Sequence, residues 1–160
     1  MPVFNRNRHS GSSGVVAAAY TIDNSIRLND DDSAYMHRVI GSDGDSKQGT
    51  FSLWVKRGNL AINTTLLEAA ESRFYFTAAD KITHYLERPS RAKNLTTTAV
   101  YRDPSAWQHI FCNWDTTPST PESELWVNGV QVSSFSTNTN NLSQNDSGTY
   151  WDSGKDIQIG

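Results

Sequence analysis

The chain has 160 residues, a formal net charge of −3 and a pI near 5.7. This length fits one domain with a sizeable core, and a chain without a basic excess lacks the charge pattern of a nucleic-acid binder. Aromatic residues make up 11% of the sequence, which predicts a packed globule. No apolar stretch is long enough for a membrane-spanning helix. We therefore expect neither nucleic-acid binding nor membrane insertion.

Residues 1–21 differ in composition from the rest and are expected to form an N-terminal arm or tether. Basic residues and a Gly/Ser cluster precede a short apolar run, VVAAAY, which is too short to be the core of a secretory signal. The segment is interpreted either as a frayed terminus or as an arm that becomes ordered on a partner surface. In the second case the anchoring residues would be Phe4, Arg6, Arg8, Val15, Val16 and Tyr20.

Strand signals dominate from residue 22 onward. Residues 50–58 (TFSLWVKRG) place Phe51, Leu53 and Val55 on one face, because side chains alternate along a strand. The apolar stretch at 107–115 predicts a central strand covered on both faces, and residues 65–72 (TLLEAAES) predict the one helical turn. Further strands are expected over 25–29, 33–40, 72–77, 81–88, 96–101 and 156–160. The short connection AAD between 72–77 and 81–88 favours a hairpin of these two strands.

Residues 123–135 (SELWVNGVQVSSF) carry the clearest local signal, an Asn-Gly pair between two runs of β-formers. A type I′ turn needs positive φ at both central residues, which Asn128 and Gly129 tolerate. The resulting register assigns four side chains to the core and leaves Trp126 on the opposite face, as a candidate subunit contact. The four core side chains are Leu125, Val127, Val130 and Val132.

Short strands, frequent turns and almost no helix predict an all-β protein with an antiparallel β-sandwich. The sequence stops at a strand, IQIG, and a sandwich that ends there leaves an unpaired edge. We expect either that a partner covers this edge or that the 160 residues belong to a longer polypeptide. Cys112 is the single cysteine, so an intrachain disulfide is excluded. It is expected to pack as a small hydrophobe rather than to act as a nucleophile.

Several motifs occur together in a recognisable order: FSLWVKRG, VYRDPSAWQHIFCNWDTT, LWVNGVQVSSF and the final IQIG. In this order they resemble the laminin-G-like, concanavalin A-like jelly-roll domains, in particular those of bacteriophage virion proteins. The resemblance covers residues 22–160 and implies two packed antiparallel sheets. Such domains usually continue with an F-D-G-x-x-x-E-V stretch that supplies closing strands. That stretch is absent here, so the resemblance implies a sandwich without its last strands.

Sugar-cleaving enzymes on this type of sandwich hold carboxylates in an E-x-D-x-x-E pattern, because glycoside hydrolysis needs two carboxyl groups at a defined separation. The sequence has no such pattern; its nearest groups are Glu68 with Glu71 and Glu122 with Glu124. We therefore expect no enzyme activity and no cofactor.

Two binding sites for small ligands are considered. Residues 29–33 (NDDDS) are dense in oxygen ligands of the kind that calcium accepts, but they lack the spaced alternation and the glycine of an EF-hand loop, and an acidic solvated turn is the preferred interpretation. Tyr150, Trp151 and Asp152 lie in a polar loop and form the best candidate for a glycan contact, with Trp151 filling a gap at the sandwich rim as the alternative. His37, His84 and His109 lie in separate strands, without the spacing of zinc ligands.

The resemblance implies a non-enzymatic virion structural protein, of a tail fibre, tail appendage, head fibre or decoration, made in the bacterial host cytoplasm. Its implied partners are other virion proteins, reached through the N-terminal arm. A homo-oligomer is expected, with a trimer favoured. The alternative is a carbohydrate-binding module for a host surface glycan.

Overall fold

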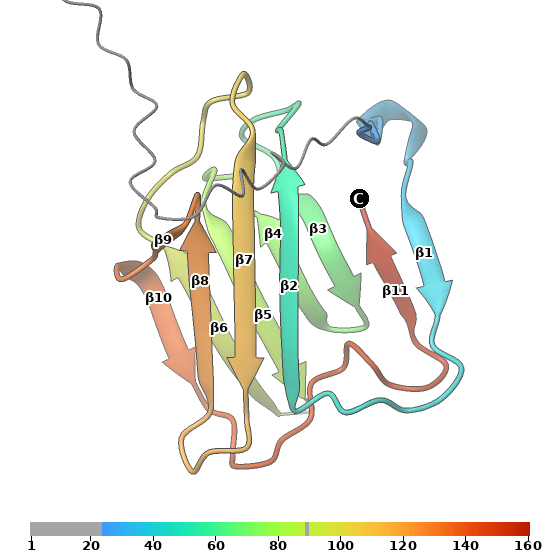
Figure 1. Cartoon of the computed structure of the whole chain (residues 1–160), viewed down its shortest axis with the longest axis vertical. Helices are drawn as coiled ribbons and strands as arrows, with labels where there is room; N and C mark the ends of the chain where they lie inside the picture. The colour runs from blue at the N-terminus through green and yellow to red at the C-terminus, as the bar shows by residue number, and fades with distance from the viewer. Residues whose placement is uncertain (1–23, 89) are drawn as a thin grey trace, which may run out of the picture.

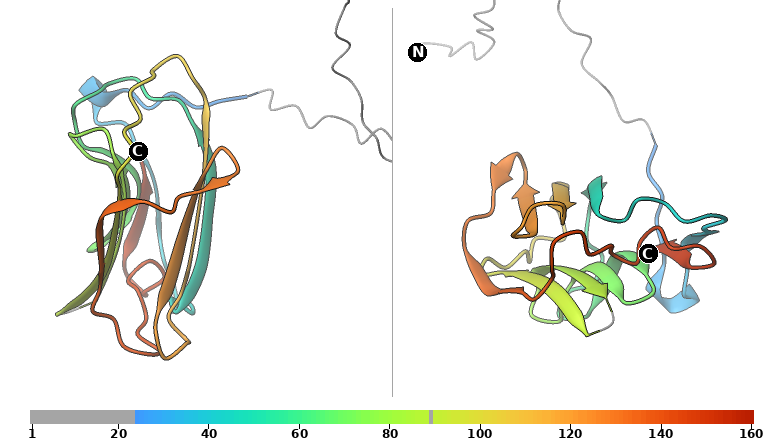
Figure 2. Two further views of the ribbon diagram at one scale, coloured as in Figure 1. Left: turned by 90° about the vertical axis from the view of Figure 1, so that its left-hand side faces the viewer. Right: turned by 90° about the horizontal axis from the view of Figure 1, so that it is seen from below.

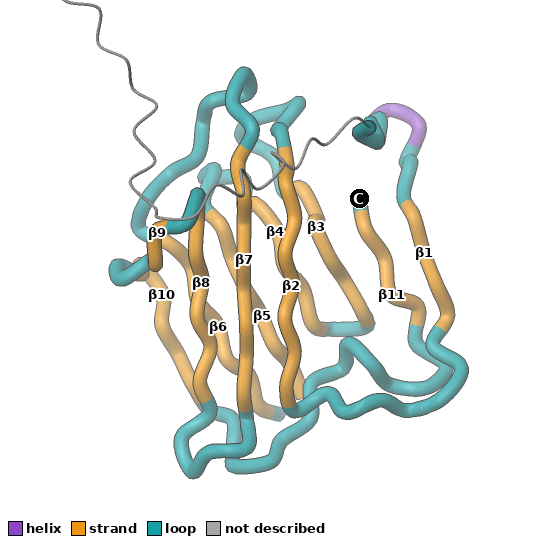
Figure 3. Tube along the Cα trace, in the orientation of Figure 1, coloured by secondary structure: helices purple, strands orange, loops and turns teal. Residues whose placement is uncertain are grey.

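The computed structural model describes residues 24–88 and 90–160. The six residues expected to anchor the arm therefore lie outside the described residues. Within them, one 3-10 turn, η1 (Asp30–Asp32), precedes the strands, and it is the purple segment in Figure 3. No helix of the described part is long and apolar enough to cross a membrane.

Two antiparallel sheets form the fold (Figure 1). The seven-stranded sheet has the order β1-β11-β3-β4-β5-β6-β10, and the four-stranded sheet has the order β2-β7-β8-β9. Strands of the larger sheet are β1 (Met36–Val39), β3 (Thr64–Ala69), β4 (Ser72–Phe76), β5 (Ile82–Arg88), β6 (Arg91–Thr97), β10 (Phe135–Asn140) and β11 (Asp156–Ile159). Strands of the smaller sheet are β2 (Gln48–Val55), β7 (Gln108–Asp115), β8 (Glu122–Val127) and β9 (Val130–Gln131). The predicted all-β sandwich is confirmed.

The two sheets lie face to face, as the edge-on view of Figure 2 shows, and their facing side chains form one core. Phe51 of β2 packs edge-on against Phe74 of β4, with ring centroids 5.4 Å apart. His84 of β5 packs against Trp114 of β7 at 5.6 Å. These pairs place β2 over β4 and β7 over β5. Leu125 in β8 is fully buried in the same core.

The predicted hairpin is present, with one change in the core assignment. Asn128 and Gly129 have φ of 52° and 77°, as a type I′ turn requires. Leu125 and Val127 are buried, and Val132 packs at the edge of the core. Val130 was assigned to the core, but it is 70% exposed. The reason is its position at the start of a two-residue edge strand that has no neighbour beyond it.

Three local predictions were wrong. Residues 65–72 form nearly all of β3, the turn that follows it and the first residue of β4 instead of a helical turn. Pairing on both sides of β3 overrides the helix propensity of Leu, Glu and Ala there. Residues 25–29 form no strand, and the strand expected at 96–101 ends at Thr97.

Strand β7 is central in its sheet, as predicted, but only one of its faces is covered. Its even-numbered residues are buried, while the odd-numbered ones on the outer face are half-buried. The predicted pairing of β4 with β5 is confirmed, from Arg73 opposite Tyr85 to Phe76 opposite Ile82.

Candidate functional site

Tyr150 was expected to contact a glycan, but it lies inside the core. Its ring is fully buried, 5.1 Å from the ring of Trp114 and stacked on His84 at 6.4 Å. Burial also raises the pKa of its hydroxyl well above the ordinary value. A sugar cannot reach this ring, so the structure removes Tyr150 from the predicted binding set.

The loop around Trp151 closes one end of the sandwich. Trp151 packs against the core, and its carbonyl accepts a hydrogen bond from the backbone of Gly44 at 2.9 Å. Just before it, the Thr149 hydroxyl donates to the carbonyl of Ala69 at 2.9 Å. Asp152 is half-buried beside this plug. The arrangement corresponds to the rim-filling alternative for Trp151 rather than to an aromatic surface open to a ligand.

A different set of rings is accessible, on the outer face of the four-stranded sheet, where Trp126 was expected to lie. Register places Trp54 opposite His109 and Phe111 opposite Trp126. We call these four residues the aromatic face. The rings of Trp54 and His109 lie 5.2 Å apart, and Trp54 is 53% exposed. Trp107, two residues before His109, is 49% exposed.

Polar side chains lie between these rings and are fixed by hydrogen bonds to one another. Ser52 Oγ and His109 Nε2 are 2.9 Å apart. Glu124 accepts hydrogen bonds from Asn113 Nδ2 and from Gln131 Nε2, each at 3.2 Å. Rings with amide, hydroxyl and carboxylate groups beside them can contact either the apolar face and hydroxyls of a sugar or the surface of a protein subunit.

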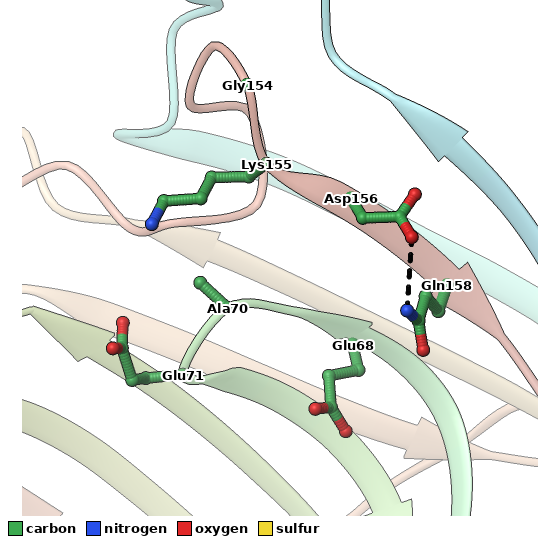
Figure 4. A pocket seen from close by; sticks show the side chains of 7 residues that line it. All are labelled: Glu68, Ala70, Glu71, Gly154, Lys155, Asp156 and Gln158. Atoms are coloured by element: carbon green, nitrogen blue, oxygen red, sulfur yellow. Dashed lines mark hydrogen bonds between the residues drawn. The ribbon is translucent and has the colours of Figure 1, made fainter.

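The outer face of the larger sheet carries an open, polar pocket where β11 meets the turn between β3 and β4 (Figure 4). Its charged members are Glu68, Glu71, Lys155 and Asp156. Gln158 donates a hydrogen bond to Asp156 at 3.1 Å, and His37 lies 2.9 Å from the same carboxylate. The pKa of Asp156 is lowered, mainly by its hydrogen bond with His37.

Five described aspartates have a pKa below the ordinary value of a carboxyl group. A glycosidase acid needs a raised pKa, whereas every carboxyl group with a clear shift is lowered. These groups are Asp80, Asp103, Asp115, Asp146 and Asp156.

The acidic turn considered for calcium includes η1. Asn29 Nδ2 donates to the carboxylate of Asp32 at 2.7 Å. Among the described residues, no group of three or more His, Cys, Asp or Glu side chains is placed to hold a metal ion. Cys112 is buried, and burial raises the pKa of its thiol to about 12.

The motif W-V-K-R contributes a buried charge network that sequence reasoning missed. Arg57 donates to Asp80 at 2.8 Å and to the carbonyl of Tyr101 at 2.9 Å, and it stacks over the ring of Phe76. A backbone hydrogen bond from Ala61 and contacts with Arg102 and Arg57 lower the pKa of Asp80 to about 2. Since Arg57 and Asp80 are buried against the core, the network joins the loops at one end of the sandwich and holds the fold rather than a ligand.

Fold and surface together define a concanavalin A-like jelly-roll sandwich without a metal cluster in its described part. The family described as the concanavalin A-like lectin/glucanases superfamily matches residues 22–157, and the chain belongs to it. No curated protein matches the sequence. Among solved structures, the native heptameric SAP-like pentraxin from Limulus polyphemus is similar, with a TM-score of 0.52 and 13% identity. The match covers 79% of this chain and 57% of the pentraxin chain, so the chain spans little more than half of that relative.

Proposed function

We propose that this chain is a non-catalytic structural protein of a bacteriophage particle, joined to its partners through its N-terminal arm. The non-catalytic part is supported by the absence of an E-x-D-x-x-E pattern from the sequence, because glycoside hydrolysis needs two carboxyl groups at a defined separation. The virion context has its support in the ordered motifs shared with phage jelly-roll domains. The aromatic face and the neighbouring Trp107 support a role in contacts, because Trp54 and Trp107 are about half exposed and aromatic residues are enriched at interfaces.

Deleting residues 1–20 tests the role of the arm in the particle. We expect the truncated protein to keep the sandwich fold, measured by circular dichroism, and to be lost from purified particles. A variant with Ser10, Ser12 and Ser13 changed to Ala keeps the arm length and is the control. Full incorporation of the truncated protein would contradict the proposal, and the copy number per particle would test the expected trimer.

Carbohydrate binding is the second candidate, and the aromatic face favours it over the loop at 150–152. Trp54→Ala and Trp126→Ala remove rings from that face, and each is expected to weaken glycan binding about tenfold. Trp151→Ala is the control, since its ring packs on the core. A glycan array and a host-cell binding assay measure this. Loss of binding in Trp151→Ala alone, with an intact fold, would return the site to the loop.

A further inference from the structure

The edge of β2 is the least protected strand edge in the described part of the chain. Strand β2 pairs only with β7, so its other side is open. It has eight residues, QGTFSLWV, with no charge, no proline and no register shift against β7. The other edge strands are shorter, charged or bulged: β9 has two residues, β1 (MHRV) carries basic side chains, and β10 contains a register shift. A long, uncharged edge is a template for strand addition.

Backbone groups of β2 point toward the open side at every second residue. The backbone N–H of Asn128 donates to the carbonyl of His109 at 2.8 Å, so odd-numbered residues of β7 direct their backbone toward β8. Alternation in antiparallel sheets then turns the even-numbered residues of β7 toward β2. By register, Thr50, Ser52 and Trp54 of β2 direct their N–H and C=O groups away from β7.

Beside this edge, the larger sheet extends beyond the smaller one. Strands β11 and β1 continue past β2 without a covering strand (Figure 1). Ile157 faces the core, so alternation turns Ile159 and its partner Met36 to the same side. Ile159 is 37% exposed and Met36 is 41% exposed. The inward residues of β2 are also only half-buried, whereas those of β7 are buried.

The space beside β2 suits an added strand better than a second whole sandwich. If two β2 strands paired directly, the β11 and β1 of each copy would meet the larger sheet of the other, because both project past β2 on the same side. A single extended segment has no such conflict. It would pair with Thr50, Ser52 and Trp54 and lie over β3, next to the half-exposed Ile159 of β11.

We propose that residues Val15–Ile22 of a neighbouring copy of this chain add as a strand to the open edge of β2. This segment, VVAAAYTI, has eight residues without charge or proline, which matches the length and neutrality of β2. The first described residues, 24–27, are exposed, and this blue segment leads away from the sandwich in Figure 2. Because residues 24–27 lead outward, we assign the donated strand to a neighbouring copy rather than to the same chain. The inference deepens the arm's proposed role in assembly, but it is tested on purified protein without particles.

The test compares full-length variants by light scattering over a dilution series. Thr50→Pro removes an N–H from the open edge without breaking a bond to β7, and the preceding Gly49 tolerates the constraint. Ala18→Pro changes the donated segment and leaves the sandwich untouched. We expect both to be monomers at concentrations where the unchanged chain is an oligomer. The controls, Thr50→Ala and Ser12→Pro, should assemble normally.

Hydrogen exchange reads out the same contact residue by residue. On assembly, the amides of Thr50, Ser52 and Trp54 should slow by about tenfold or more, while those of Phe51 and Leu53 should change little. Oligomers that persist in both proline variants would overturn the proposal. Protection of the three amides in a monomer would assign the strand to the chain's own segment instead. Free exchange at every concentration would mean that nothing binds the edge. None of these outcomes predicts whether the arm is needed for incorporation into particles, so the two proposals can fail independently.

Discussion

The two sides of the sandwich differ in how completely they are closed. On the closed side, β7 and β8 lie over β5, and the Ser123 hydroxyl of β8 reaches His84 of β5 at 3.0 Å. On the open side, β2 is the last strand of the smaller sheet, and no strand of that sheet covers β11 and β1 of the larger sheet. Both sides are built from similar alternating strands. The difference shows that side-chain alternation makes a strand, whereas its neighbours decide how much of it is buried.

The largest effect on stability is expected from a comparison of two residues that lie opposite each other in β2 and β7. Ile110 is fully buried and lies opposite Leu53, which is only half-buried. Ile110→Ala should lower the free energy of unfolding by about 2–5 kcal/mol. Leu53→Ala should lower it by only about 1–2 kcal/mol, because the half-buried Leu53 side chain removes less apolar surface from the solvent when the protein folds.

Urea denaturation of the monomer measures both losses. Equal losses of unfolding free energy in the two variants would contradict the conclusion that β2 is less completely covered than β7. If a neighbouring strand covers β2, the cost of Leu53→Ala should grow when the measurement is repeated at concentrations where the chain assembles.

Acid should destabilise the closed side through His84. Burial, followed by the charge of Lys93, lowers the pKa of His84 from 6.5 to about 3. Between these two values the unfolded chain binds a proton that the folded chain does not, so stability falls as the pH drops from 6.5 toward 3. One such group contributes a slope of at most about 1.4 kcal/mol per pH unit.

Unfolding free energies between pH 7 and 5.5 test this, because the carboxyl groups of the unfolded chain take up few protons in that range. His84→Gln should flatten the profile, whatever its own stability. His37→Gln, on the exposed edge of the open side, is the control. An unchanged slope in His84→Gln would show that another group senses the acid.

The smallest effect is expected at the β8–β9 turn, where backbone conformation acts without packing. Gly129 has a φ of 77° and open space around its α-carbon. Gly129→Ala should therefore cost about 1 kcal/mol through the left-handed conformation alone. Gly58, just after β2, also has open space but no such φ, so Gly58→Ala should be close to neutral. Thermal unfolding of both variants distinguishes them.

Local patterns predicted the elements whose neighbours agree with their propensity. The Asn128–Gly129 turn, the inward set of β2 and the β4–β5 pairing could be derived from alternation and turn chemistry, which act within a few residues. The TLLEAA stretch could not, because its helix formers become a strand only by pairing with β4 and β11.

The candidate site was less predictable than the fold. Tyr150 stands in a polar loop, a setting typical of an exposed ring, but the loop folds back over Trp114 and buries it. Trp126 was placed on the outer face from register alone, and it lies there beside Phe111. That Trp54 and His109 continue the same face required the pairing of β2 with β7, which no local signal encodes.

The sequence by itself determined an all-β sandwich, the type I′ hairpin and the side of each strand on which Trp54 and Trp126 project, because these depend on period-two alternation and on φ preferences of single residues. Only the tertiary structure decided that Arg57 and Asp80 form a buried pair 2.8 Å apart, that Tyr150 belongs to the core, and that β2 keeps an open edge. These features depend on contacts between residues far apart in the chain, and pairing and burial exist only once the sheets have assembled.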